Sequence, residues 1–286
     1  MRLLVASVVC VLLALNFPGI VSKLEDNITE CGDFFFQAQS PVLPGILENS
    51  VTQDNRYKII CQKYKNKIRF ATLYDTTNRI PVFSAYKYTG TDESVRPEIP
   101  RIWMTELQLE QHSDAEMHYP FLYQARNEDY WIKDKGTKNE CTHGTLFSMK
   151  HIADLETAES TFTLTNTVPE IVGFRERTLT LANAFKDFMH HNCLDNNNKI
   201  AAYVLTGAIP SKATWNKRVN IPSFMWTVFC CYNSSTNSMI SQTYRDENKK
   251  DSNNTVTIKD LKSLEDFLQK YMPNGVRPML FNNNCE

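Results

Sequence analysis

Residues 70–88 read FATLYDTTNRIPVFSAYKY, two apolar segments separated by a short polar one. Residues 68–74 are rich in strand-forming side chains, and residues 80–88 alternate apolar and polar positions over much of their length. The intervening Asp75-Thr-Thr-Asn78 has the composition of a turn. This stretch therefore predicts two neighbouring β-strands joined by a tight turn.

Outward from these strands, the chain carries both β-rich and helical patterns. Apolar residues at 181, 185, 188 and 189 have helical spacing, and residues 259–272 predict an amphipathic helix. Further strands are predicted at residues 57–61, 160–164, 200–205 and 224–231, with a helical turn within 122–129. The sequence has no repeats and no low-complexity linker. We therefore predict one α+β domain over residues 23–286, with a mixed or antiparallel central sheet and packed helices.

The N-terminus has the pattern of a secretory signal peptide over residues 1–22. Arg2 is followed by an apolar run from Leu3 to Leu15, and Ser22 is a small residue suited to cleavage. The run is shorter than the ~20 apolar residues of a membrane span. We expect a secreted, extracellular protein that is not held in a membrane; an uncleaved N-terminal anchor is the alternative.

Seven cysteines remain after removal of residues 1–22, and none of them has the spacing of a zinc site. Export therefore favours disulfides over a metal centre. Cys230 and Cys231 lie in a predicted strand, where neighbouring side chains point to opposite faces, so each should pair with a different partner. We predict that Cys31 pairs with Cys61, and that Cys193 and Cys285 each pair with one member of the Cys230–Cys231 pair.

Glycosylation and charge give two further expectations. Asn27, Asn233 and Asn253 each begin an Asn-X-Ser/Thr triplet, which is a glycosylation acceptor in a secreted chain. Without residues 1–22 the chain has 30 basic and 32 acidic side chains, a net charge of −2. Tight duplex binding relies on phosphate neutralisation, so this balance favours at most weak contact with DNA or RNA unless a local basic groove forms.

Several segments together resemble the DNA/RNA non-specific endonucleases, which are ββα-metal nucleases of the His-Me finger type. They are residues 70–88, the stretch STFTLTN at 160–166 with Pro169, AYVLTG at 202–207, and VNIP at 219–222 with Trp226. The resemblance covers residues 31–272. It implies that residues 141–183 form a strand, a loop or second strand, and then a helix against the central sheet.

The resemblance also implies a catalytic site. In this family, the histidine of an Asp-Arg-Gly-His tetrad is the general base, and a helix asparagine holds a hydrated Mg²⁺. A glutamate eight residues after the asparagine orients the waters. Here the tetrad falls on Thr142-His143-Gly144-Thr145, so the base position is Thr145. The asparagine and glutamate positions are Arg175 and Asn183.

These substitutions remove the chemistry of all three positions. A threonine hydroxyl is not a base near neutral pH, and a guanidinium cannot ligate a cation. We therefore predict a degenerate nuclease site with no cofactor. Cys141 replaces an aromatic position beside the tetrad, and we expect it to be the unpaired thiol.

Two other functions stay open. His143 lies two residues before Thr145 on the same strand face, so it could serve as the base of an active, Mg²⁺-dependent phosphodiesterase that cleaves DNA or RNA. Alternatively, the chain is a secreted glycoprotein that binds a protein partner. A basic patch would favour nucleic acid, and the candidate contacts are Lys65, Lys67, Arg69 and Arg177, together with Arg175. A solvated, lysine-protected strand edge is the other interpretation of the run at 63–69.

Overall fold

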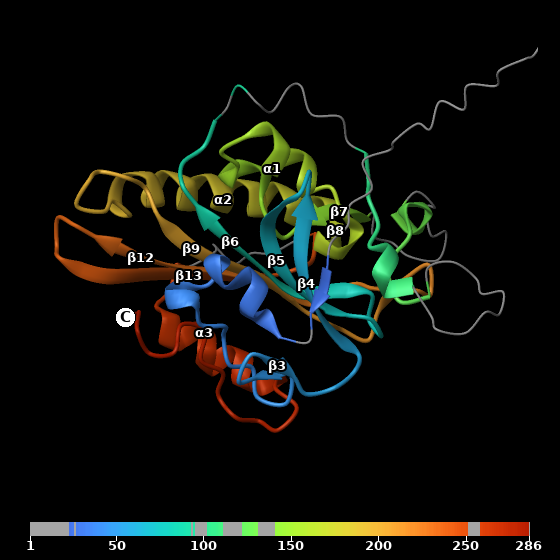
Figure 1. Ribbon diagram of the computed structural model, residues 1–286. Helices are drawn as coiled ribbons and strands as arrows, with labels where there is room; N and C mark the ends of the chain where they lie inside the picture. Colours follow the sequence, from blue (N-terminus) through green and yellow to red (C-terminus); the bar gives the residue numbers. More distant parts are fainter. Residues whose placement is uncertain are drawn as a thin grey trace, which may run out of the picture.

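The computed structural model describes residues 23–25, 27–92, 94, 102–110, 122–130, 141–250 and 258–285. Its centre is a seven-stranded sheet in which every pair of neighbours is antiparallel, as the sequence predicted (Figure 1). In spatial order the strands are β1 (Lys23–Glu25), β4 (Tyr57–Tyr64), β5 (Lys67–Asp75), β6 (Ile80–Tyr88), β9 (Ala202–Ile209), β12 (Phe224–Asn233) and β13 (Ser238–Glu247).

Shorter elements surround this sheet. Three two-stranded units are β2 (Leu47–Glu48) with β3 (Val51–Thr52), β7 (Cys141–Thr145) with β8 (Thr167–Ile171), and β10 (Thr214–Trp215) with β11 (Val219–Asn220). The α-helices are α1 (Leu155–Ser160), α2 (Val172–Asn192) and α3 (Leu261–Leu268). Short 3-10 helices lie at Ile28–Phe34, Phe36–Ala38, Leu107–Glu110, Asn127–Tyr130, Met149–His151, Leu164–Asn166 and Gln269–Tyr271.

The predicted strand pair at residues 68–88 is present as β5 and β6. Asp75 shapes the turn between them, because its carboxylate accepts hydrogen bonds from the backbone N–H groups of Thr77 (3.0 Å) and Asn78 (3.1 Å). The Asn78 side chain adds a third hydrogen bond to the same carboxylate, at 2.7 Å. A buried aspartate therefore supplies the acceptors that the turn's backbone donors need.

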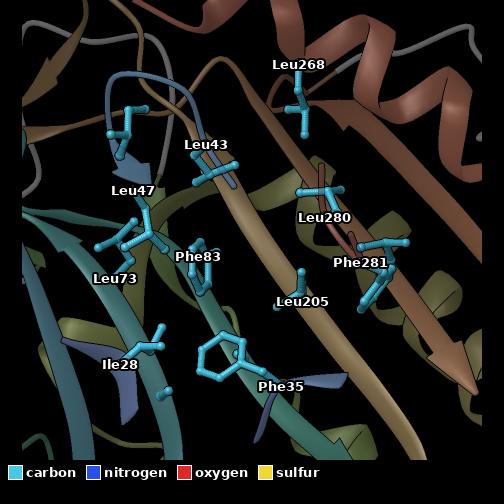
Figure 2. Close-up of a cluster of buried hydrophobic side chains, with 14 of the residues drawn as sticks. Ile28, Phe35, Leu43, Leu47, Leu73, Phe83, Leu205, Leu268, Leu280 and Phe281 are labelled. Carbon is cyan, nitrogen blue, oxygen red and sulfur yellow. The ribbon is translucent and has the colours of Figure 1, made fainter. Parts of the chain in front are cut away.

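The sheet is apolar on both faces, and a different layer covers each one (Figure 1). On one face Phe70, Tyr86 and Phe229 pack with Phe185 and Met189 of α2. On the other face Leu73, Phe83 and Leu205 pack with α3 and with the N-terminal segment around Phe35 (Figure 2). Because side chains alternate along a strand, a sheet buried on both faces has nearly continuous apolar strands, as β12 does.

The disulfides follow the same alternation and agree with the sequence prediction. Cys230 points to the α3 side and bonds to Cys285, whereas Cys231 points to the α2 side and bonds to Cys193 at the end of that helix. Cys31 bonds to Cys61. Among the described residues Cys141 is the free cysteine. Each bridge joins the sheet to a covering segment, and each should stabilise the fold by ~2–4 kcal/mol.

One expectation for local structure was wrong. Residues 160–164 are not a strand, because Ser160 ends α1, which is capped by Asp154, and the strand begins only at Thr167. The helix predicted at 259–272 is present as α3, Leu261–Leu268, and continues as a 3-10 helix to Tyr271. The helical turn predicted within 122–129 is a 3-10 helix that begins at Asn127.

Strand β13 was missed because its sequence, SMISQTYRDE, is polar, as suits an edge strand with one solvated side. The signal-peptide prediction concerns residues 1–22, which lie outside the described residues. Within the described part of the chain, no helix is long and apolar enough to cross a lipid bilayer.

Gly207 gives a direct test of the packing on the α3 face. A Cβ at this position would lie 2.2 Å from the Trp226 ring and 2.7 Å from the Val82 carbonyl oxygen. We expect Gly207→Ala to lower the free energy of unfolding by about 3 kcal/mol, since both neighbours are held in the sheet. Urea unfolding would measure this. The control is Gly32→Ala, whose Cβ would meet its nearest neighbour at 3.5 Å. An equal effect for the two variants would contradict the packing described.

Candidate active site

A β-hairpin followed directly by a helix lies over the α2-covered face of the sheet (Figure 1). β7 pairs antiparallel with β8, with Thr142 opposite Glu170 and Thr145 opposite Thr167. α2 begins at Val172, immediately after β8 ends. The order strand, strand, helix for residues 141–183 is therefore confirmed, and it brings the tetrad positions close to the N-terminal turns of α2.

His143 is enclosed between two aromatic rings. Its imidazole stacks on Trp103 with ring centroids 4.1 Å apart, and on Tyr130 with centroids 4.2 Å apart. Its Nε2 is buried and has no hydrogen-bond partner among the described residues. Burial, reinforced by the nearby charge of Arg175, lowers the pKa of His143 to about 4. The ring is therefore neutral near pH 7, and it is a weak base.

Arg175, which the resemblance predicts at the position of the family's metal-binding asparagine, makes an internal ion pair. Its guanidinium donates a hydrogen bond to the backbone carbonyl oxygen of His143. The same Nη1 lies 3.5 Å from the carboxylate of Glu170. A positive charge is thus held against β7 and β8.

Glu170 is the buried partner of this pair, with 3% of its surface exposed. Its carboxylate accepts a hydrogen bond from the Thr178 hydroxyl at 2.7 Å. Burial raises the pKa of Glu170, while the Thr178 hydrogen bond and Arg175 act in the opposite direction. The sequence contained a signal for this residue, because Glu170 is an acidic side chain within the otherwise apolar run TVPEI. Its pairing with Arg175 could not be inferred from that signal.

Gly144 leaves room for Glu170 between β7 and β8. A Cβ at this position would lie 2.7 Å from the Cβ of Glu170 and 2.8 Å from its carboxylate. Only glycine lets β8 carry the buried glutamate so close to β7.

Thr145, the family's base position, lines a cavity of about 70 Å³ between the hairpin layer and the sheet. Arg175, Glu170 and Thr178 line the same cavity. The position therefore still faces polar groups. A threonine there can donate or accept a hydrogen bond, but it cannot take a proton from water near neutral pH.

His151 also lines this cavity, and sequence reasoning missed it. Its Nδ1 lies 2.8 Å from the Tyr86 hydroxyl, and its Nε2 lies 3.0 Å from the Ala182 carbonyl oxygen. A carbonyl only accepts, so Nε2 donates and Nδ1 of the neutral ring accepts from the tyrosine. Both ring nitrogens are occupied, and His151 acts as a structural link between the sheet and α2.

Asn183, the position of the family's glutamate, is half-buried on α2 two turns beyond Arg175. An amide cannot orient metal-bound waters as a carboxylate does. Within the described part of the chain, no group of three or more His, Cys, Asp and Glu side chains could hold a metal ion.

The candidate nucleic-acid contacts divide into two groups. Lys65, Lys67 and Arg69 belong to the β4–β5 hairpin and its turn. Lys65 pairs with Glu159 at 2.9 Å. The Arg69 side chain is only 5% exposed and pairs with Asp154 and Glu156. Most of this positive charge is therefore balanced by acidic residues at or beside α1.

Arg177 lies on α2 and is bound within the protein. Its Nε pairs with Asp246 at 2.8 Å, and its remaining N–H groups donate to the backbone carbonyls of Gly173, Glu247, Lys249 and Lys250. This side chain fixes the end of β13 to α2. Its guanidinium donors are all engaged, so binding a phosphate would require some of these hydrogen bonds to break.

A β-hairpin and helix packed on an antiparallel sheet define this chain as having the fold of a ββα nuclease. Residues 49–271 match the DNA/RNA non-specific endonuclease family, and the chain belongs to that family.

Two curated relatives are endonuclease domain-containing 1 proteins. The chain is 29% identical over 279 residues to the protein from Homo sapiens, covering 93% of this chain and 49% of the relative. It is 29% identical over 266 residues to the protein from Mus musculus, covering 90% and 47%. The chain thus spans about half the length of these relatives. A chain from the crystal structure of an EndoG/EndoGI complex, on the mechanism of EndoG inhibition, aligns with a TM-score of 0.48 and 18% identity, over 70% of this chain and 80% of the other.

The enclosed imidazole should make the fold sensitive to acid. Folding lowers the pKa of His143 from 6.5 to about 4, so between these values the unfolded chain binds a proton that the folded chain does not. Stability is therefore lost as the pH falls through this window. We expect His143→Phe, which keeps a ring between Trp103 and Tyr130, to reduce that loss by about 2 kcal/mol, a figure discounted for the partial exposure of the ring.

Urea unfolding at a series of pH values from 7 to 4 would measure this effect. The matched control is His190→Phe, because His190 is exposed at the end of α2; it should keep the parental acid dependence. If His143→Phe and His190→Phe lose stability in parallel with the parent, His143 is not a neutral, enclosed histidine.

Proposed function

We propose that this chain is a secreted, disulfide-linked glycoprotein of the DNA/RNA non-specific endonuclease family whose nuclease site is degenerate. The observation that carries the proposal is the Arg175 guanidinium, which binds the His143 carbonyl and Glu170 at the family's metal position. The fold would then serve as a binding or structural module.

Loss of the metal follows from the charge at this position. Two unit charges 4 Å apart repel by about 4 kcal/mol at an effective dielectric constant of about 20, and Mg²⁺ carries twice that charge. Glu170 offsets part of the positive charge, but it already accepts from Thr178 and pairs with Arg175. A hydrated Mg²⁺ would have to displace the arginine. Without the ion, the scissile phosphate loses several kcal/mol of transition-state charge stabilisation.

Loss of the general base supports the same conclusion. Thr145 cannot accept a proton, and His143 is enclosed by Trp103 and Tyr130 with a pKa of about 4. General-base assistance is worth ~10²–10⁴-fold in rate, and it is greatest when the pKa of the base lies near the working pH. Base and metal would therefore be missing together.

A working Mg²⁺-dependent phosphodiesterase with His143 as its base is the second candidate. The observation in its favour is that His143 is neutral near pH 7 and lies on the hairpin beside Arg175 and Glu170. The ring would need to leave the two aromatic rings to reach a water molecule. Arg175 would then have to replace the metal at the phosphate.

Any contact with nucleic acid should be weak. Four of the five candidate contacts already pair with acidic side chains of the protein, namely Lys65, Arg69, Arg175 and Arg177. The net charge of −2 without residues 1–22 adds no general attraction for phosphates. A protein partner is the remaining binding role.

The first expected outcome concerns cleavage. The secreted protein should leave supercoiled plasmid and single-stranded RNA uncut above a mock preparation, in Mg²⁺ and in a chelator alike. Cleavage by the unaltered protein that disappears in His143→Ala would establish the second candidate instead.

A gain-of-function variant tests the same proposal by restoring cleavage. We expect the combination Thr142→Asp, His143→Arg, Thr145→His, Arg175→Asn and Asn183→Glu to restore Mg²⁺-dependent cleavage. Glu170→Gln should accompany it, because Arg175→Asn leaves a buried carboxylate without its cation. An arginine at 143 can stack between Trp103 and Tyr130. The matched control carries Thr145→Ala in place of Thr145→His, and it should remain inactive.

Export and glycosylation form a separate expectation. The full chain expressed in mammalian cells should appear in the medium without residues 1–22, with a glycan at Asn27. The Asn27 side chain is exposed, whereas Asn233 is 8% exposed and its side-chain oxygen holds the turn at Ser235. Asn253 lies outside the described residues. Glycosidase treatment followed by mass spectrometry would measure this, with Asn27→Gln as the comparison. Retention of the whole chain in the cell would contradict export.

A further inference from the structure

A cavity of about 180 Å³ lies on the α3 side of the sheet, opposite the hairpin and α2. Its floor is formed by the ends of β6, β9 and β12, through Val82, Ile209 and Trp226. Its roof includes Leu43 and Leu268, which are both labelled in Figure 2. Tyr271 and Pro273 are exposed and line the same cavity, so its mouth lies on their side.

The size and lining of this cavity suit a small apolar molecule. The walls are mainly aliphatic and aromatic, and Trp226 presents a ring to the interior space. An apolar cavity of roughly 150 Å³ in another protein stays dry and binds benzene, so this volume accommodates a substituted single ring. Binding sites of this kind combine an apolar wall with few polar groups that fix orientation.

One such polar group is present at the edge of the cavity. Arg56 lines it, and its side chain is 34% exposed and pairs with Asp75 through Nη2. The Asp75 carboxylate is already occupied by the backbone of Thr77 and by Asn78. Asp75 engages the guanidinium through Nη2, so other N–H groups of the partly exposed guanidinium are left to donate to a ligand.

The charges around this donor select among acceptors. Asp75 is negative and lies beside Arg56, so the pair is neutral overall. A carboxylate ligand would gain from Arg56 but be repelled by Asp75, and it would lose its hydration in an apolar cavity. A neutral carbonyl or ether oxygen can accept a hydrogen bond from the Arg56 guanidinium without either cost.

We propose that this cavity is a binding site for a small, neutral, mainly apolar molecule that carries one hydrogen-bond acceptor oxygen, with Arg56 as its donor. The site lies on the other face of the sheet from the nuclease position and does not depend on the proposed function.

Three probes of nearly equal shape separate the contributions. Cumene has no acceptor, acetophenone has a neutral carbonyl oxygen, and benzoate has a charged carboxylate. Calorimetry and ligand-observed NMR on the full secreted protein should give acetophenone a Kd on the order of 0.1 mM. Cumene should bind about tenfold more weakly, because it cannot accept a hydrogen bond from Arg56. Benzoate should bind more weakly than acetophenone.

Two kinds of variant locate the binding. Val82→Phe fills the cavity and should weaken acetophenone binding at least about tenfold, whereas Val276→Phe adds the same group at an exposed residue outside the lining and should not. Arg56→Lys keeps a cation for Asp75 but lacks the planar guanidinium. It should reduce acetophenone binding to the level of cumene and leave cumene binding unchanged.

Several results would overturn the proposal. Absence of acetophenone binding up to its solubility limit would remove the site. Unchanged binding in Val82→Phe would place it elsewhere on the protein. Equal binding of acetophenone and cumene would remove the role of Arg56. If thermal unfolding shows that Val82→Phe does not fold, Ile46→Phe provides a second variant that fills the same cavity. A comparison of acetophenone and cumene binding to Arg56→Lys tests the site without filling it.

Discussion

The alternation of side chains along β12 is the constraint on which the rest of the structure depends. Cys230 and Cys231 are neighbours in sequence, yet they lie on opposite faces of the sheet and bond to Cys285 and Cys193. One bridge holds the C-terminal segment on the α3 side, and the other holds the end of α2. Because the sheet is buried on both faces, neither covering layer can be lost without exposing apolar strands to water.

This two-sided arrangement separates the features of the molecule. The α2 side carries the hairpin and helix that correspond to the family's nuclease site, together with a polar cavity of about 70 Å³. The α3 side carries an apolar cavity of about 180 Å³ with the Arg56–Asp75 pair at its edge. Changes on one face need not disturb the other, since the strands between them are held by their own hydrogen-bond ladders.

The residues predicted to stand at the nuclease position make a structural arrangement of their own. Arg175 places a positive charge there, and Glu170 pairs with it at 3.5 Å. The imidazole of His143 packs as an aromatic ring, not as a base. The three residues depend on one another. The buried glutamate needs the charge of the arginine, and Gly144 leaves space for that glutamate. These contacts pair the buried charges at the site, while the buried Nε2 of His143 has no hydrogen-bond partner among the described residues.

Several features could be determined from the sequence alone because they rest on local periodicity or on adjacent residues. These were the β5–β6 pair, the α2 pattern, the turn at Asp75 and the opposite directions of Cys230 and Cys231. Resemblance to the family placed the strand, strand and helix order of residues 141–183. Sequence reasoning failed at β13, whose polar sequence hides an edge strand, and at residues 160–164, where the cap by Asp154 outweighs β propensity.

Tertiary structure alone decided which side chains are free and which are paired. Arg69 and Arg177 look like exposed cations in the sequence, but their partners lie at Asp154, Glu156 and Asp246, roughly seventy to ninety residues away in the chain. Trp103 and Tyr130 reach His143 from separate loops, and Arg56 meets Asp75 only because β4 and β5 are neighbours. Such contacts join segments that chain entropy keeps apart until the sheet forms, so no local pattern records them.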